Sequence, residues 1–196
     1  MLPEIGKVDK ETFDRVIFPN LGKPDRSVLL GPRHGVDAAV IELPGGEVMV
    51  VAEDPTFGMP TLMPHFGWCI VHICASDVAV LGIRPKYMTI CLMLPPGTEE
   101  SVLEHIWLEV HQECQKLDIA VVGGHTGVYP GIGYPLNGGC TMFGIGKKEQ
   151  LTPPSNARVG DRVIMTKGPA VEAAGVLAFQ AEKALAEKFG RDIVEK

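Results

Sequence analysis

The segment from Phe66 to Leu81 places the strongest constraint on the fold of this chain. It reads as a helix that is apolar nearly all round, and a helix of that kind is buried on every side. Gly82 follows it and is typical of a residue that ends a helix. His72 and Asp77 interrupt the apolar run, which is also too short to span a bilayer. We therefore expect a soluble protein with this helix at its centre.

The segments around this helix alternate between strand and helix patterns. Two strands of a hairpin are expected at residues 37–43 and 48–52, joined by a Pro-Gly-Gly turn. The other expected elements are a short helix at 9–18, a loop at 19–35, strands at 86–94, 119–122 and 136–145, and an amphipathic helix that ends at Leu117.

A segment typical of a linker between domains begins near Pro153. A fresh strand is expected at Arg162–Thr166 and an alanine-rich helix at Pro169–Phe189. Because one strand and one helix cannot bury their own apolar face, we interpret residues 155–196 as the beginning of a truncated second α/β domain. Residues 1–154 would then form the first domain, and the chain would be a fragment of a longer protein.

Composition excludes several classes of function. The net charge is −6 and no run of Lys or Arg stands out, so a nucleic-acid partner is not expected. The five cysteines include no CxxC pair, which favours free thiols in a reducing compartment over a thiolate metal cluster. The N-terminus lacks the apolar core of a signal peptide. We expect a cytoplasmic protein with no membrane partner.

Three aspartates lie at strand ends or inside the buried helix. Asp37 opens the first strand of the hairpin and Asp54 closes the second, so the two carboxylates are expected side by side. Carboxylates held close repel one another unless a cation or a proton lies between them. Asp77 lies among Ile, Cys, Ala and Val, where an unpaired charge is costly. Oxygen ligands at separate strand ends suit Mg²⁺ or Mn²⁺ bound to phosphate oxygens.

Each aspartate also has a purely structural interpretation. Asp37 is suited to cap a turn, and an aspartate that precedes a proline, as Asp54 does, commonly initiates one. Asp77 has Arg84 and Lys86 as candidate partners for an ion pair. Taken one at a time, these structural interpretations are the more common ones.

Residues 121–128, VVGGHTGV, place a histidine after a pair of glycines. The valines are typical of a buried strand, and the glycines predict a bend that something can approach closely. His125 is therefore a candidate fourth metal ligand, and its imidazole would shift the preference from Mg²⁺ toward Mn²⁺. His34 and His65, in Gly- and Pro-rich loops, are second-tier site candidates. His72 is more typical of a core histidine whose hydrogen bonds are satisfied.

Five segments, in order, resemble the aminoimidazole ribonucleotide synthetase superfamily, which also includes selenophosphate synthetase, thiamine monophosphate kinase and the hydrogenase-maturation carbamoyl dehydratase. The resemblance covers roughly residues 30 to 170, and the order of the segments is more specific than any one of them. The segments are GPRHGVDAAVIEL, VVAEDPTFG, ICASDVAVLGIRPKYMTICLMLP, DIAVVGGHTG and SNARVGDRVIMTKGP.

The resemblance implies an α+β domain, with a mixed or antiparallel sheet packed on helices, that forms a homodimer by joining sheets. ATP would lie in a cleft near the interface, with Mg²⁺ on its phosphates. Asp37, Asp54 and Asp77 match the family's metal-binding acids. Gly123 and Gly124 match the glycines that let the backbone approach the phosphates. Ser76 and Thr126 match further positions at the nucleotide.

Two positions depart from the family pattern. Val36 stands where the family often has a first acid before Ala-Ala-Val, and His125 replaces the acid of the Gly-Gly-Asp-Thr turn. The site is therefore less negative than a typical magnesium-ATP site. We keep three functions open: ATP-dependent phosphoryl transfer or ligation on a small-molecule substrate, a manganese-dependent phosphohydrolase, and a non-catalytic nucleotide-binding protein.

Overall fold

A computed structural model describes residues 4–194 of the chain. Its centre is a six-stranded sheet with the order β1-β2-β3-β6-β4-β5. All neighbouring strands are antiparallel except β4 and β5, which are parallel. This mixed sheet with packed helices confirms the expected α+β class. The strands are β1 (Val28–Leu30), β2 (Ala39–Glu42), β3 (Glu47–Phe57), β4 (Pro85–Leu94), β5 (Ala120–Val128) and β6 (Asn137–Lys147).

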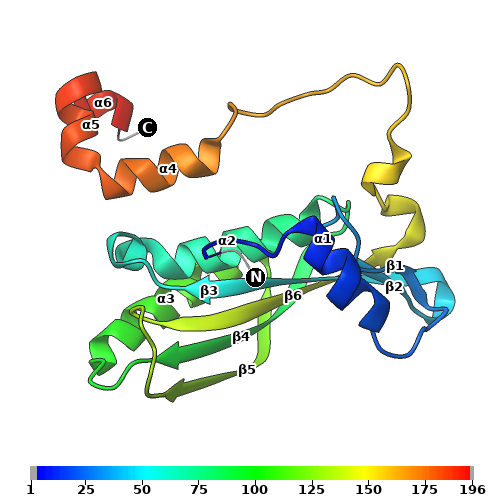
Figure 1. Ribbon diagram of the computed structural model, residues 1–196, viewed down its shortest axis with the longest axis horizontal. Helices are drawn as coiled ribbons and strands as arrows, with labels where there is room; N and C mark the ends of the chain where they lie inside the picture. Colours follow the sequence, from blue (N-terminus) through cyan, green and yellow to red (C-terminus); the bar gives the residue numbers. More distant parts are fainter. Residues whose placement is uncertain (1–3, 195–196) are drawn as a thin grey trace.

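Helices α2 (Phe66–Ala79) and α3 (Glu100–Leu117) lie on one face of the sheet (Figure 1). Residues of α2 such as Val71 and Val78 are fully buried, as expected for a central helix. They pack with alternate residues of the strands, among them Val50 on β3, Ile90 on β4 and Met142 on β6. This shared core fixes α2 against β3 and β6. Within residues 4–194, no long helix covers the opposite face of the sheet (Figure 1).

The hairpin of β2 and β3 is longer than the sequence pattern predicts. β3 continues through Asp54 and Pro55 to Phe57, and it pairs with β6 along its whole length. Pro55 is tolerated because β2 pairs with β3 only as far as Val51, so this stretch of β3 has β6 alone as a neighbour. The predicted loop at 19–35 also contains a short strand, β1, which pairs with β2.

The N-terminal helix begins where the sequence predicts. Asp9 caps α1 (Lys10–Thr12), and its carboxylate accepts a hydrogen bond of 2.7 Å from the Thr12 backbone N–H. The chain then continues through a π-helical turn (Phe13–Ile17) and a 3₁₀ turn (Phe18–Asn20).

The C-terminal segment differs from its prediction. Residues 162–166 form no strand, and Val163 and Ile164 are almost fully exposed, at 99% and 85%. A strand forms only where a neighbour satisfies its backbone groups, and none lies beside these residues. The predicted single helix is divided at Ala181 into α4 (Val171–Gln180) and α5 (Glu182–Phe189), followed by α6 (Arg191–Val194).

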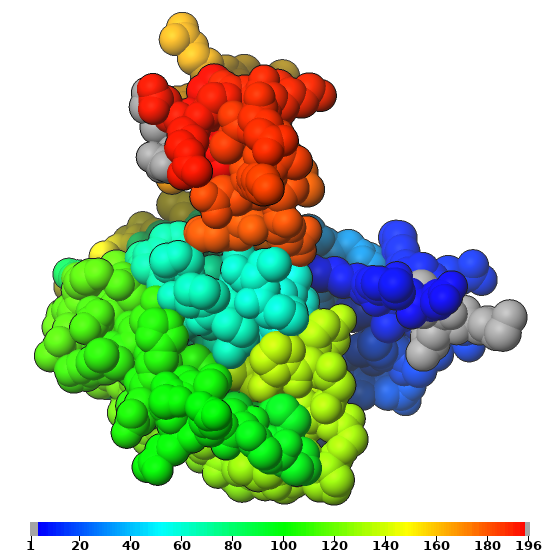
Figure 2. All heavy atoms as spheres, turned by 90° about the vertical axis from the view of Figure 1, so that its left-hand side faces the viewer, coloured from blue at the N-terminus to red at the C-terminus, as the bar shows by residue number. Residues whose placement is uncertain are grey.

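These C-terminal helices lie above the face of α2 that points away from the sheet (Figures 1 and 2). Residues 157–168 connect them to the sheet as an extended segment. The Phe179 ring of α4 packs on the His65 ring, with 5.1 Å between their centres. Within residues 4–194, no helix combines the length and the hydropathy that crossing a membrane requires.

Candidate functional site

The three aspartates come together between the hairpin and α2. Asp54 lies on β3 with the same side-chain direction as the buried Val50 and Ala52, toward α2. Asp77 lies in the last turn of α2. Asp37 lies two residues before β2, beyond the last β2–β3 pair of Ala39 with Val51, and its carboxylate is near enough to raise the pKa of Asp77.

The electrostatics of these aspartates are dominated by repulsion between like charges. The pKa of Asp77 is raised to about 7, first by burial and then by the neighbouring carboxylates of Asp54 and Asp37. The Oδ2 atom of Asp54 is buried and has no hydrogen-bond partner among the described residues. An orphaned carboxylate oxygen beside two other acids is a position that a cation would stabilise. The chemistry of these residues, though not their present spacing, suits a divalent metal ion.

The purely structural interpretations find no support at two of the three positions. Among residues 4–194, neither Arg84 nor Lys86 forms an ion pair with Asp77. Asp54 lies inside a strand and initiates no turn. Within the same residues, however, no three His, Cys, Asp or Glu side chains are close enough to form a ready-made metal cluster. The three carboxylates are close enough to affect one another's charge but too far apart to share one ion, as expected when no cation offsets their mutual repulsion.

His125 lies apart from this acid cluster in the same chain. It is on the edge strand β5, and three strand-to-strand steps separate β5 from β3. Three steps amount to about 14 Å. His125 also pairs with Cys91, which alternates with the buried Ile90 and so faces the open side of the sheet. A single chain cannot bring His125 to the metal position between β3 and α2.

A bulge in β5 explains the side on which His125 lies. Val121 pairs with Met88 but Gly123 pairs with Thr89, so Val122 is an extra residue in the strand. If Val122 instead occupied a regular position opposite Thr89, His125 would lie opposite the buried Leu92 and face the helices, because a shift of one residue reverses every side chain beyond it. The glycine pair therefore lies inside a continuous strand, and the predicted bend is wrong.

Gly124 allows β4 and β5 to approach one another closely. Its φ is +151°, and a Cβ atom there would lie 2.0 Å from the carbonyl oxygen of Ile90. Gly123 and Thr126 are on the same strand, so all three lie with β5 at the edge of the sheet. Ser76 is adjacent to Asp77, and its hydroxyl donates a 2.7 Å hydrogen bond to the backbone carbonyl of His72.

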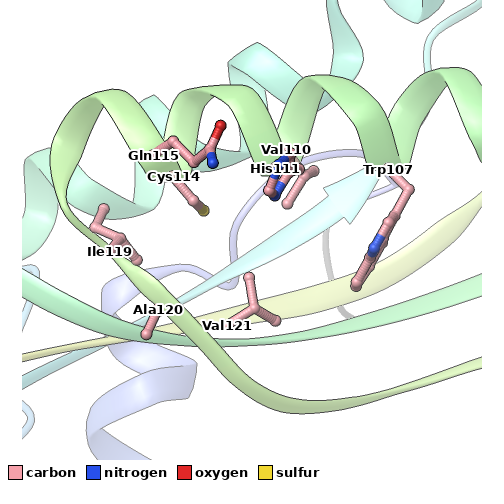
Figure 3. A pocket seen from close by; sticks show the side chains of 8 residues that line it. All are labelled: Trp107, Val110, His111, Cys114, Gln115, Ile119, Ala120 and Val121. Carbon is pink, nitrogen blue, oxygen red and sulfur yellow. The ribbon is translucent and has the colours of Figure 1, made fainter.

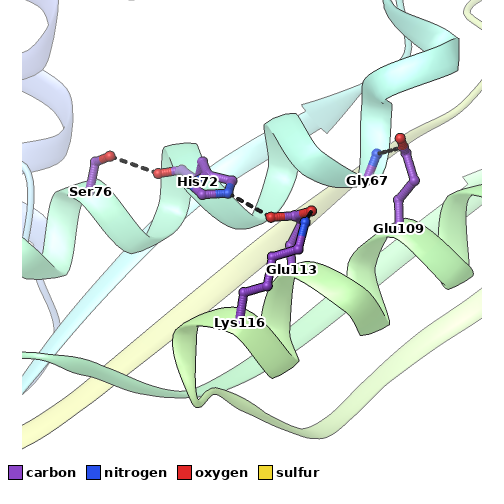
Figure 4. A network of polar contacts seen from close by, with 6 residues as sticks. All are labelled: Gly67, His72, Ser76, Glu109, Glu113 and Lys116. Atoms are coloured by element: carbon purple, nitrogen blue, oxygen red, sulfur yellow. Dashed lines mark hydrogen bonds and ion pairs between the residues drawn. The ribbon is translucent and has the colours of Figure 1, made fainter.

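The remaining histidines have local partners. His34 contacts the Asp14 carboxylate through Nε2 at 2.6 Å, and its ring packs on Phe13. His65 packs on Phe179 at the start of α2. His72 lies 3.0 Å from a carboxylate oxygen of Glu113 on α3, which confirms the prediction of a satisfied histidine (Figure 4).

Sequence reasoning missed two kinds of neighbour around the acids. The Lys7 ammonium is near enough to lower the pKa of Asp77 in opposition to the acids. Cys140 pairs with Asp54 across β3 and β6, and the buried thiol of Cys74 lies 3.7 Å from the Cys140 carbonyl oxygen. No sequence spacing links these residues to the aspartates, because strand pairing and the path of the N-terminal segment bring them there.

A separate hollow of about 330 Å³ lies between α3 and β5 (Figure 3). Trp107 and His111 reach into it from α3, with Cys114 at its floor and Val121 on the side of β5. None of the predicted site residues lines it. This hollow is therefore distinct from the acid cluster.

The chain is similar in sequence to known proteins. The chain is 26% identical over 166 residues to the thiamine-monophosphate kinase of Aquifex aeolicus (strain VF5), a match that covers 83% of this chain and 52% of the relative. It is 31% identical over 166 residues to the selenide, water dikinase of Nitratidesulfovibrio vulgaris, covering 82% and 46%. The chain thus spans about half the length of the curated relatives it matches.

The fold comparison agrees. A solved structure of AaThiL complexed with AMPPCP and TMP has a TM-score of 0.67 at 23% identity, over 82% of this chain and 56% of that one. The family model for the N-terminal domain of AIR synthase related proteins matches residues 35–146, which contain the sheet from β2 to most of β6 together with all three aspartates. The chain belongs to this family of AIR synthase related proteins.

Proposed function

We propose that this chain is part of an ATP-dependent phosphoryl-transfer or ligase-type enzyme that uses a divalent metal ion, Mg²⁺ or Mn²⁺, on a small-molecule substrate. The observation that carries the proposal is the buried, unpartnered carboxylate oxygen of Asp54 beside Asp77, whose pKa is raised. Two relatives are kinases by name, which supports phosphoryl transfer. The fold neighbour that holds AMPPCP supports a nucleotide as donor.

In this proposal Asp37, Asp54 and Asp77 hold the metal ion. A bound divalent ion would neutralise charge on the phosphoryl oxygens. The contribution of the chain is positioning: β3 and α2 are both anchored in the core, so the acids stay in place when a ligand arrives. Asp77 would give up its proton as the metal binds.

We further propose that the chain forms a homodimer through its open sheet face and the edge strand β5. The exposed backbone of β5 has no neighbour on its outer side within the described residues, and Val122 and Val128 on it are 58% and 57% exposed. His125, Gly123, Gly124 and Thr126 all lie on this strand. A role for them at a metal ion or a phosphate group would require a second copy of the chain.

We also retain the proposal that residues 155–196 belong to a second domain. The nearly full exposure of Val163 and Ile164 supports it, since apolar side chains of this size are commonly buried.

The proposal is tested by calorimetric titration of the whole chain with Mn²⁺ and with ATP, separately and together. We expect ATP to bind more tightly in the presence of Mn²⁺, and Asp54→Asn to abolish that difference. The matched control is Asp118→Asn, which changes an acid after α3, outside the cluster. Equal metal-dependent binding by wild type and Asp54→Asn would overturn the assignment. ADP formation is then measured with candidate acceptors.

Neither alternative function is favoured by a specific observation. The two relatives named above are kinases, and neither is a phosphohydrolase. Hydrolysis of a generic phosphate ester that depends on Mn²⁺ and is lost in His125→Ala would reverse this preference.

A further inference from the structure

The hollow between α3 and β5 has the composition of a small-molecule site (Figure 3). Its floor is formed by three buried apolar residues, Val110, Cys114 and Ile119. Its volume of about 330 Å³ is at the lower end of the range for such sites, so it suits a ligand of one ring. Because β5 is three strand-to-strand steps from β3, a ligand here would lie outside the acid cluster of the same chain.

The ring of Trp107 forms one wall of the hollow and is 41% exposed. It extends from α3 toward β5, where Val121 lies on the other side of the hollow (Figure 3). The other tryptophan of the chain, Trp68, stacks on His72 with 4.5 Å between the ring centres. Within residues 4–194, Trp107 has no aromatic partner of this kind. An aromatic ligand would supply one, and aromatic pairs are stabilising beyond the area that they bury.

Two exposed polar side chains, His111 and Gln115, also line the hollow, one turn apart on α3. A neutral imidazole and an amide can each donate and accept hydrogen bonds. Among residues 4–194, neither side chain has a hydrogen-bond partner.

The hollow provides no fixed charge for an ionic ligand. None of the described residues that line it is an Asp, Glu, Lys or Arg. The thiol at its floor stays protonated at neutral pH, because burial raises the pKa of Cys114 to about 11. The ligand that fits is therefore uncharged, with apolar faces and a polar group that both donates and accepts hydrogen bonds.

We propose that this hollow binds an uncharged aromatic molecule of one ring that carries an amide or hydroxyl group. The ring stacks on Trp107, and the polar group forms hydrogen bonds with His111 and Gln115. A second copy of the chain that covered the hollow with an apolar surface would bury these two polar side chains without partners, which is costly. The inference is independent of the metal ion proposed at the aspartates, because none of them lines the hollow.

The test is a fluorescence titration of the whole chain with benzamide, which has one aromatic ring and one amide. The variant Trp68→Phe leaves Trp107 as the single tryptophan. We expect a saturable change in its emission with a Kd of about 1 mM or tighter. Trp107→Phe leaves only Trp68, whose emission should not change. Cyclohexanecarboxamide has the same amide without a flat ring and should bind about threefold more weakly or worse.

Three substitutions in the Trp68→Phe chain locate the site. Gln115→Leu should weaken benzamide binding by about threefold to tenfold, because one hydrogen bond is lost. Gln112→Leu is the matched control, the same change at an exposed position of α3 outside the hollow, and should stay within about twofold. Ala120→Phe fills the hollow from the side of β5 and should abolish binding. Circular dichroism checks that each variant is folded.

Several results would overturn the inference. They are no saturable change with benzamide, equal affinity for the two carboxamides, equal effects of Gln115→Leu and Gln112→Leu, and retained binding in Ala120→Phe. The titration is repeated at several protein concentrations. A constant Kd supports a free small molecule as the occupant, whereas a Kd that rises with protein concentration would show that a second copy of the chain covers the hollow instead.

Discussion

Two carboxylate regions contact α2 and differ in almost every physical respect. At its C-terminal end, Asp77 faces Asp54 and Asp37, and its pKa is raised to about 7 by burial and by those acids. Near its middle, His72 contacts Glu113 of α3, whose pKa is lowered by Lys116 and then by His72 itself (Figure 4). One region collects like charges, and the other pairs opposite ones.

This difference distinguishes a candidate functional site, the three aspartates, from a structural contact, the one between His72 and Glu113. Glu113 is only 7% exposed, yet both of its oxygens are bound, one by Lys116 at 2.5 Å and one by His72 at 3.0 Å. Among residues 4–194, the Oδ2 atom of Asp54 has no such partner. A folded chain keeps a cluster of like charges at a cost in stability, and functional sites are where such costs are usual.

The largest expected effect follows from removing a charge at the acid cluster. Asp77→Asn should weaken manganese-dependent ATP binding by about tenfold or more. Mutation of residues that only orient metal ligands already reduces metal affinity by about 10- to 100-fold. Calorimetry with Mn²⁺ and ATP measures it. Asp118→Asn serves as the control outside the cluster. Full retention of metal-dependent binding would show that the two carboxylate regions are both structural.

Glu113→Gln should instead lower the free energy of unfolding by about 2 kcal/mol, because charge-assisted hydrogen bonds to His72 and Lys116 are weakened. Urea unfolding monitored by circular dichroism measures the change. Glu104→Gln, at an exposed position of the same helix, is the matched control and should change it by less than about 0.5 kcal/mol. Nucleotide binding should be unaffected, and its loss would connect the two regions.

Much of the fold can be predicted from the sequence, because strong periodicity predicts element type. The buried helix, the hairpin and the strand before α3 all lie close to their expected positions. The short strand β1 and the extension of β3 past Pro55 could not be predicted, since both depend on which strand lies alongside. The same dependence explains why residues 162–166 remain without a strand.

The candidate site also has a part that the sequence predicts and a part that it does not. The grouping of Asp37, Asp54 and Asp77 follows from the hairpin and the buried helix, both of which the pattern predicts. The direction of the His125 side chain depends on one extra residue in β5, Val122. The pattern of apolar residues does not predict such a bulge in a run of valines and glycines. The assignment of these residues to a metal ion stays a prediction.

The pH dependence of stability should have opposite signs in the two regions. The raised pKa of Asp77 means that the folded chain holds this proton more tightly than the unfolded chain, so stability is lost as pH rises from about 4 toward 7. Asp77→Asn should therefore gain about 1 kcal/mol relative to wild type between pH 5 and pH 8, after allowance for solvent screening. Thermal melts without metal at both pH values measure the difference. A constant difference would contradict the raised pKa.

The smallest effect is expected at Lys116, which sharpens the distinction between a buried pair and its exposed partner. Lys116→Met removes a side chain that is 66% exposed, and exposed ion pairs contribute less than about 1 kcal/mol. Glu113 would keep the contact with His72, so Lys116→Met should cost clearly less than Glu113→Gln in the same urea experiment.

Because Lys116 makes the larger contribution to lowering the pKa of Glu113, Lys116→Met should also lose stability at a higher pH than wild type when acidified. Stability of the paired carboxylate is present above the ordinary pKa of a glutamate and is lost as pH falls through the lowered value. If Lys116→Met proved as damaging as Glu113→Gln, the support between α2 and α3 would rest on the lysine rather than on the histidine that joins the helices.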